Sequence, residues 1–557
     1  MSKAPSTLEI ALRAKPHHIH AVATAAGIHA DEIEAFGSHK AKVSLQILER
    51  LHNRPSGKLI CVSGMTPTKE GDGKTCTSIA LTQAMGLLKK KVMLCLREPS
   101  LAPIFGFKGG GTGGGYAQVL PMEDINLHFT GDIHAIQAAH NLLAAVMENH
   151  LHHGNVLDID PEKILWRRTM DISDRQLRDV VVGVSKSSRF AKHRTGFNIT
   201  AASEVMAALG LATSIHGFKN KLAKISVALN KSGELVTAKD LNAAGAMALL
   251  LKDTLKPNLV QTLEGQPVFM HTGPFANVSH GNNSLISTTL ALKLANYVVT
   301  ESGFGTDLGL EKMFDIVCRE GDLKPSVVVL VVSIKALKSH AGEAMGSRKL
   351  SEALREGFEN MDRHIENITK FGLPMVVAIN RFPQDTPDEI KAVRDYLQSE
   401  NIDCAVSEGV RLGGEGALEL AEKVMKALTE RPAQFKFFYP ADISTEDKVQ
   451  RLATGLYGAG GVTYLEEAKE DLEMIHRLKL DTLPVCVAKT PYSFSDDPNV
   501  KGAPTGWKLK VRRVHPRTGA GFLVVVAGKI MLMPGFPERP VLEEMDLAES
   551  GEPRGMF

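Results

Sequence analysis

The stretch from Leu59 to Thr75 constrains the fold of this 557-residue chain more than any other part. It opens on an apolar, β-branched run, Leu59 to Val62, which predicts a buried strand. A glycine-containing turn follows, and we expect a helix to begin near Lys74. Such an arrangement directs backbone N–H groups and the positive end of a helix dipole toward an anion. It predicts a phosphate-binding loop, although an ordinary glycine-rich βα turn has a similar pattern.

Residues 68–75 fit the nucleotide-binding pattern G-x-x-x-x-G-K-[ST], except that Thr68 replaces the first glycine. In that pattern the lysine, here Lys74, reaches the terminal phosphates, and the next hydroxyl, here Thr75, meets Mg²⁺. The ATP-binding residues expected in this P-loop are Thr66, Pro67, Thr68, Lys69, Glu70, Gly71, Asp72, Gly73, Lys74 and Thr75.

Composition narrows the class of protein. A hydrophobic content of 43% and a charged content of 23% are ordinary for a globular chain, here of roughly two to four domains. A net charge of +2 argues against nucleic-acid binding by bulk charge. The cysteines form no C-x-x-C pair, which fits a reduced compartment. No signal peptide or membrane span is evident, so we expect a cytoplasmic protein without membrane contact.

Apolar runs recur along the chain and predict an α/β fold, a parallel sheet with helices on both faces. A helix over 77–88 and a strand over 91–96 would complete a βαβ unit whose second strand neighbours the first. Nearly continuous apolar runs over 326–332 and 375–380 are typical of strands covered on both sides. Other expected elements are helices within 6–53 and over 133–150, 201–211, 284–295 and 417–428, strands over 180–184, 225–229, 297–301 and from 485, and a hairpin over 522–534 around Gly528.

Charged residues follow the second strand, at Arg97 and Glu98. Because ligands of parallel sheets bind at the carboxyl ends of the strands, both are site candidates. An arginine there offers a fork of donors for a carboxylate or a phosphate, although a surface salt bridge is the alternative. The ends of later strands add His271, Asn277, Glu301 and Asp307 to the same edge.

A glycine-rich segment over 109–115, with six glycines in seven positions, excludes a helix or a stable strand. It is a flexible linker or a loop that closes on a ligand, and its neighbours Lys108, Tyr116 and Gln118 favour the second interpretation. Possible Mg²⁺ or proton-transfer groups follow at Glu123, Asp124, His128 and Asp132. The histidines at 134, 140, 150, 152 and 153 lack the spacing of a metal site, which favours core or solvated roles.

Several long motifs resemble those of the formate–tetrahydrofolate ligase family, in the family's order and across essentially the whole chain. They are Thr66–Thr75, Leu96–Leu101, Lys108–Gln118, Pro121–Asp132, Gly273–Asn277, Thr300–Gly309, Ala488–Pro498 and Met533–Pro537.

This resemblance implies that ATP, formate and tetrahydrofolate give ADP, phosphate and 10-formyltetrahydrofolate, in one-carbon metabolism, through formyl phosphate. Lys74 would hold the phosphates, Thr75 would contribute to the Mg²⁺ that accompanies ATP, and Arg97 would bind formate and then formyl phosphate. Glu98 and Asp132 would organise the arginine, the metal or the N10 proton. The residues implied to face the nucleotide are Glu301, Gly303, Phe304 and Gly305.

The resemblance is weakest around the folate. Many members place a tryptophan where this chain has Val410, and that tryptophan sandwiches the pterin together with a phenylalanine, here Phe382. One lost aromatic face weakens folate binding by roughly 5- to 150-fold. Pro491 replaces a family glutamine, and Asp72 a family glutamate. The expected folate-binding residues are Phe382, Val410, Tyr116 and Gln118.

The resemblance also implies a homotetramer, activation by a monovalent cation in some members, and three parts of the chain. These parts are a P-loop domain of 1–111 and 266–371, an inserted α/β domain of 112–265, and a C-terminal domain of 372–557 that contributes to the folate pocket.

Two other functions compete with this one. The first is a ligase that also forms an acyl phosphate but uses another amine acceptor, which only Val410 and Pro491 favour. The second is a nucleotide-binding regulator or scaffold with weak catalysis. Arg97 counts against the regulator, because a protein that only binds nucleotide needs no carboxylate-binding arginine.

Overall fold

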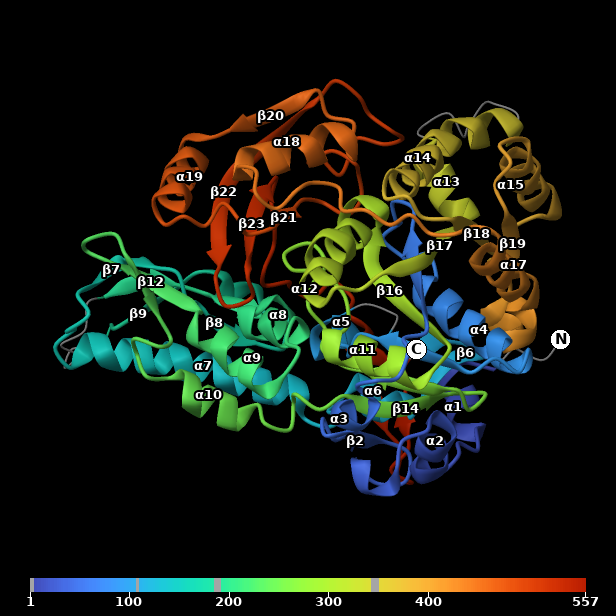
Figure 1. The fold of residues 1–557 in the computed structure, drawn as a ribbon, viewed down its shortest axis with the longest axis horizontal. Coiled ribbons are helices and arrows are strands. Elements are labelled where there is room, and N and C mark those ends of the chain that lie inside the picture. The colour runs from blue at the N-terminus through green and yellow to red at the C-terminus, as the bar shows by residue number, and fades with distance from the viewer. Residues whose placement is uncertain (1–4, 107–109, 185–191, 342–349, 557) are drawn as a thin grey trace.

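The computed structural model describes residues 5–106, 110–184, 192–341 and 350–556. Its largest unit is a 12-stranded sheet with the path β1-β2-β14-β15-β4-β16-β3-β17-β18-β19, to which β6 attaches at β14 and β5 at β6 (Figure 1). The strands are β1 (Ile33–Ala35), β2 (Ala41–Val43), β3 (Lys58–Gly64), β4 (Val92–Leu96), β5 (Gly113–Gly114), β6 (Ala117–Leu120), β14 (Asn258–Thr262), β15 (Pro267–Met270), β16 (Tyr297–Gly305), β17 (Pro325–Val332), β18 (Met375–Asn380) and β19 (Cys404–Ser407).

The run from β15 to β19 is parallel, whereas β14 and β2 pair antiparallel at one end. The parallel α/β prediction is therefore confirmed. The expectation that the first two strands are neighbours is wrong, because β16 lies between β3 and β4 and pairs with both. The residues that follow β3 and β4 consequently meet across the end of β16.

Alternate residues of the central strands face two separate cores, as the two-residue period of a strand requires. Ile60 and Val62 pack with α4 (Lys74–Leu87) and α17 (Leu418–Glu430) on one face. Leu59 and Cys61 belong to the core of the other face. The helices that contribute to that second core include α2 (Ile19–Ala26), α3 (Ile47–Leu51), α11 (Leu285–Leu294), α13 (Ile334–His340), α14 (Leu350–Lys370) and α15 (Pro387–Ser399).

The middle of the chain forms a smaller unit with a core of its own, seen at the lower left of Figure 1. The long helix α7 runs along it, and β12 pairs with β13 and β7. Its main elements are α7 (Asp132–His152), β7 (Ile159–Ile164), β8 (Arg168–Met170), β9 (Val180–Val182), β10 (His193–Thr195), β11 (Phe197–Ile199), α8 (Glu204–Gly210), α9 (Ile215–Ala223), β12 (Ser226–Asn230), β13 (Leu235–Thr237) and α10 (Ala244–Leu250).

The C-terminal third forms a four-stranded sheet in the order β20-β22-β23-β21. Its elements are α18 (Thr445–Gly455), β20 (Gly461–Tyr464), α19 (Glu466–Arg477), β21 (Val485–Ala488), β22 (Lys508–Arg517) and β23 (Phe522–Ala527). The predicted hairpin around Gly528 is wrong, because β23 pairs antiparallel with the earlier β22. Strand β22 alternates buried and exposed residues along much of its length, which is the sequence pattern of a half-buried strand. The more obvious apolar run after Gly528 predicts a different partner for β23 in its place.

The large sheet takes strands from both sides of the expected domain breaks: β6 and β14 come from 112–265, and β18 and β19 come from 372–557. The three-part division of the chain stays a prediction. In the described part of the chain, every helix is too short or too polar to cross a bilayer.

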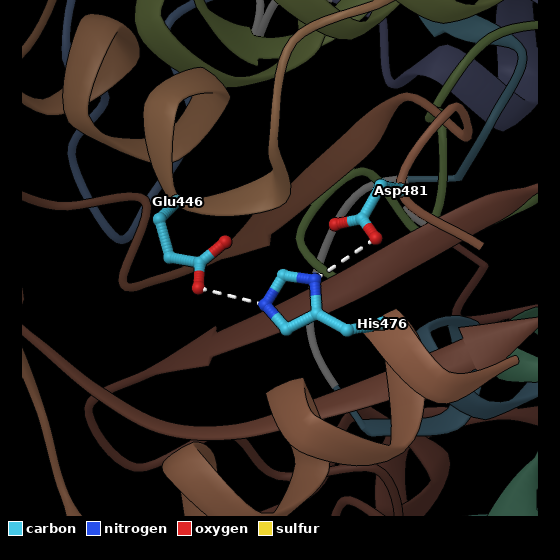
Figure 2. Close-up of side chains that lie close together, drawn as sticks. All are labelled: Glu446, His476 and Asp481. Atoms are coloured by element: carbon cyan, nitrogen blue, oxygen red, sulfur yellow. Dashed lines mark hydrogen bonds and ion pairs between the residues drawn. The ribbon is translucent and has the colours of Figure 1, made fainter. Parts of the chain in front are cut away.

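His476, at the end of α19, lies between two carboxylates of the C-terminal unit (Figure 2). Its Nδ1 is 2.9 Å from Asp481 Oδ2 and its Nε2 is 3.0 Å from Glu446 Oε1. A metal ion would take only one of these nitrogens, whereas an imidazolium donates from both. The hydrogen bond to Asp481 raises the pKa of His476, burial opposes that shift, and Glu446 adds to it. The cluster therefore fits a charged histidine that links α19 to α18.

Replacing His476 by Asn tests this link. A raised folded-state pKa gives stabilisation that is complete below the ordinary pKa of about 6.5 and is lost as the pH rises through the folded value. Because His476 is partly exposed, we expect a loss of only about 0.5 kcal/mol at pH 6, shrinking toward pH 9. Thermal melts between pH 6 and pH 9 measure the stability difference between the parent protein and the variant. Replacing the exposed His216 by Asn is the control. A stability difference that grows as the pH rises would contradict a charged His476.

Candidate active site

The loop from Met65 to Gly73 joins β3 to α4 and is folded by Asp72. The Asp72 carboxylate accepts hydrogen bonds from the Thr68 backbone N–H at 2.7 Å and from Ser333 Oγ at 2.5 Å. Asn380, at the end of β18, donates to the Asp72 carbonyl at 3.1 Å. Gly73 precedes the helix with a φ of 78°, and a Cβ there would lie 2.1 Å from Asn380 Nδ2. Asp72 thus shapes the loop, and Gly73 is required by both its backbone angle and the lack of space.

Glu301 joins the residues that follow β3 and β4. It lies in β16 with 5% exposure, and its Oε2 accepts a hydrogen bond from Thr75 Oγ1 at 2.8 Å. Its Oε1 lies 3.7 Å from Arg97 Nη2. Lys74 is close enough for Glu301 to affect its pKa, which burial lowers, Glu301 raises and Arg97 lowers further. One carboxylate therefore gathers a lysine, an arginine and a hydroxyl at the carboxyl edge of the sheet.

Lys74 and Arg97 bring two positive charges to the one carboxylate of Glu301, and one hydrogen-bond donor of Arg97 has no acceptor among the described residues. The Nε of Arg97 is buried and makes no hydrogen bond to any residue that the structure describes. A buried donor without an acceptor costs free energy, so the site fits an anion that supplies one. The structure brings Lys74, Thr75 and Arg97 together around one carboxylate, as their positions at strand and helix ends led us to expect.

Glu98 and Asp132 lie together in a buried network beside this site. Lys42 Nζ lies 2.8 Å from both carboxylate oxygens of Asp132, and Asn258 Nδ2 donates to Asp132 Oδ2 at 2.9 Å and to Glu98 Oε2 at 3.4 Å. Burial raises the pKa of Glu98 well above its usual value, and the nearby Asp132 adds to the shift. The pair therefore combines an ion-paired carboxylate with a carboxyl that favours its protonated form.

Lys42 was not predicted from the sequence. It stands in a three-residue strand, β2, between Ala41 and Val43, and all three residues are buried. A lysine flanked by apolar strand residues is a usable signal, because a buried lysine almost always has a partner.

Other predicted residues of this edge have structural partners. His271 is buried, with Nδ1 2.7 Å from Ser284 Oγ and Nε2 2.7 Å from the Thr254 carbonyl. Asp307 pairs with the buried Lys489 at 2.6 Å. Asp124 forms an ion pair with Lys40 at 2.7 Å. Of the other candidates, Asn277 and Glu123 are half-buried and His128 is exposed.

Two of the predicted folate-binding residues, Tyr116 and Val410, are neighbours. The Tyr116 backbone N–H donates to the Val410 carbonyl at 2.9 Å, and each residue is 43% exposed. A Cβ on Gly115 would lie 2.1 Å from the same carbonyl, so the glycine permits this approach. Phe382 is half-buried, and Lys335 Nζ lies 4.4 Å from the centre of its ring.

Gln118 has a structural role, because it is fully buried and donates to the Gly115 carbonyl at 2.7 Å and to the Thr7 carbonyl at 3.2 Å. Lys108 lies outside the described residues. Gly303 packs against Ala276, and a Cβ there would lie 2.3 Å from the Cβ of Ala276.

A comparison with known families identifies the family of the chain. The family model described as formate–tetrahydrofolate ligase matches residues 5–557, which is essentially the whole chain. The match covers the 65–73 loop, Arg97, Glu301 and the buried pair Glu98 and Asp132. The chain therefore belongs to the formate–tetrahydrofolate ligase family, an enzyme family of ATP-dependent ligases.

Proposed function

We propose that this protein joins formate to tetrahydrofolate at the expense of ATP, through a formyl phosphate intermediate. The observation that carries the proposal is the Glu301 carboxylate, which Thr75 of the loop and Arg97 share. A site that only hydrolyses a nucleotide needs the loop, the lysine and the hydroxyl. An additional arginine with a free donor beside them supplies a place for a second anion.

The chemistry explains why two anions must meet. Formate is a poor electrophile, and phosphorylation turns it into a mixed anhydride that an amine attacks. Transfer of a phosphoryl group depends on positioning and charge neutralisation. In this proposal Lys74 and the loop amides hold the nucleotide phosphates, and Arg97 holds formate in line with the terminal phosphate.

The residues of the loop also fit Mg²⁺ brought by ATP. The ion would neutralise phosphate charge, and in related nucleotide sites a threonine hydroxyl and a nearby carboxylate hold it. Thr75 and Glu301 supply that pair, with their oxygens 2.8 Å apart. The 66–75 loop, Gly303, Phe304 and Gly305 would contact the nucleotide.

Glu98 and Asp132 would act beside the formyl group. The Lys42–Asp132 ion pair fixes the carboxylate, and Asn258 links it to Glu98. Such a pair holds a proton at Glu98 and keeps Asp132 as an acceptor near Arg97. Folate would lie against Phe382, Tyr116 and Val410. A homotetramer, a monovalent cation activator, a cytoplasmic location and the three-domain division stay predictions.

The assay for this function follows ADP release with formate alone and then with tetrahydrofolate, together with the 10-formyl product. Absence of formyl product with both substrates would refute the proposal. Formate-dependent turnover with a different amine would instead favour another acyl-phosphate ligase.

Replacing Arg97 by Lys keeps the charge and removes the fork of donors. We expect formate-dependent turnover to fall by about 100-fold or more, which is typical for the loss of one preorganised donor. Binding of ATP measured by calorimetry should change little. Arg513→Lys is a matched control, because Arg513 makes two hydrogen bonds to Asp471, at 2.7 and 2.9 Å, away from Glu301's partners. An equal loss of ATP affinity and turnover in the Arg97 variant would contradict the assigned role.

Replacing Glu301 by Gln keeps the shape and removes the negative charge next to Thr75. We expect the Mg²⁺ concentration that supports half-maximal turnover to rise by about 10-fold, because an uncharged amide oxygen binds Mg²⁺ more weakly than a carboxylate does. A Mg²⁺ titration at saturating ATP measures the change. Glu204→Gln serves as the control, since Glu204 is equally buried but accepts hydrogen bonds from Gly519 and Ala520. An unchanged Mg²⁺ midpoint would exclude Glu301 from the metal site.

Replacing Val410 by Trp adds an aromatic face next to Tyr116. We expect tetrahydrofolate to bind about 5-fold tighter or better, since stacking contributes roughly 1–3 kcal/mol per base. Fluorescence titration with the folate reports the affinity. Leu412→Trp, two residues further in α16 (Gly409–Leu412), controls for surface hydrophobicity. Equal gains in both variants would argue against a folate contact at position 410.

A further inference from the structure

A single buried histidine, His364 of α14, bridges two loops of the proposed nucleotide site. Its Nε2 lies 3.0 Å from Thr66 Oγ1, and its Nδ1 lies 2.6 Å from Thr306 Oγ1. The residue has 0% exposure. Thr66 follows β3, and Thr306 follows β16 and opens the π-helical turn η4 (Thr306–Leu310). The two hydroxyls thus come from segments 240 residues apart in the sequence and meet at one imidazole ring.

Helix α14 supports the same two hydroxyls with two amides. Asn360 Nδ2 donates to Thr66 Oγ1 at 3.0 Å, and Asn367 Nδ2 donates to Thr306 Oγ1 at 3.3 Å. Residues four before and three after a helical position lie on one face of the helix. Asn360, His364 and Asn367 therefore form one polar face of α14 that is directed at the two strand ends.

The His364 imidazole is surrounded by buried groups that favour its neutral form. Burial lowers the pKa of His364 to about 3. A neutral imidazole has one donor and one acceptor nitrogen, so it accepts a hydrogen bond from one threonine hydroxyl and donates one to the other.

The ring also makes a close contact with each neighbouring segment. Its centre is 4.6 Å from that of Phe494, which belongs to the 488–498 motif. A Cβ on Gly305 would lie 2.9 Å from His364 Cε1, so the imidazole leaves no room for a side chain there. Three sequence motifs that seemed independent, around Thr66, Thr306 and Phe494, therefore converge on His364.

We propose that His364 is a positioning residue that fixes the phosphate loop and the 301–307 segment relative to each other. The inference rests on the proposed function, because that function assigns both segments to the nucleotide. Thr66 lies near the start of the loop that leads to Lys74, and Thr306 lies five residues after Glu301. With the imidazole in place, Thr75 and Glu301 stay at hydrogen-bonding distance before any ligand arrives, so nucleotide binding does not have to order them.

The test compares His364→Phe with His364→Asn and His364→Gln. The phenyl ring fills the space but satisfies neither hydroxyl, whereas the Asn amide ends near the Nδ1 position and the Gln amide near the Nε2 position. We expect the dissociation constant of MgATP, measured by calorimetry, to rise about 10-fold for Phe and less for Asn and Gln. The turnover number at saturating ATP should fall less than about threefold, within a change of 0.7 kcal/mol.

The control is His140→Phe. His140 is similarly buried, its pKa is also lowered to about 3, and it has two partners, Ser203 Oγ at 2.7 Å and the Arg167 carbonyl at 2.6 Å. It belongs to the middle unit, so this variant should lose thermal stability without a change in MgATP affinity. An equal stability loss and unchanged MgATP affinity in His364→Phe would overturn the proposal and leave His364 a structural residue.

Two further measurements allow the role of His364 to be decided if a variant fails to fold or the parent protein makes no formyl product. If His364→Phe does not fold, Thr306→Val removes one hydroxyl while the imidazole remains, and it should weaken MgATP binding about threefold or more. Unchanged affinity there would overturn the proposal. A parent protein that binds MgATP but makes no formyl product would refute the proposed function, while the affinity comparison among the variants would still decide the role of His364.

Discussion

The interaction on which the candidate site depends is the sharing of one buried carboxylate, that of Glu301, by Thr75 and Arg97. A carboxylate with little solvent contact is stable only with partners. The pairing of β16 with both β3 and β4 provides them, because it places the residues that follow those two strands on either side of Glu301. The order of strands in the sheet, rather than any local motif, therefore brings Thr75 and Arg97 to the same carboxylate.

Local patterns predicted much of the fold. Strand β18 spans Met375–Asn380, as the apolar run indicated, and α17 begins at Leu418, close to the start of the helix predicted over 417–428. Such elements are decided by neighbours in the sequence. Pairing between distant strands is not, and for that reason the partner of β23 and the strand between β3 and β4 were mispredicted. Strand order depends on which apolar surfaces fit together, and apolar composition does not encode that choice.

The same distinction divides the site. Arg97, Lys74 and Thr75 were recognisable because each stands next to a strand or helix end within a short motif. Lys42, which pairs with Asp132, and His364, which meets Thr66 and Thr306, stand in segments without any motif. Their roles come from contacts between residues 58 or more positions apart in the sequence. Such residues hold other side chains in place, and only the three-dimensional arrangement reveals them.

The core on one face of the large sheet has a consequence for how the chain is divided. It is continuous from Ile19 through the helices of that face to Ala527 of the C-terminal sheet. A chain cut near residue 372 would divide this core, with Leu310 and Phe314 on one fragment and Val487 and Leu523 on the other. The C-terminal third thus contributes to the same hydrophobic interior as the large sheet, and it also supplies β18 and β19 to that sheet.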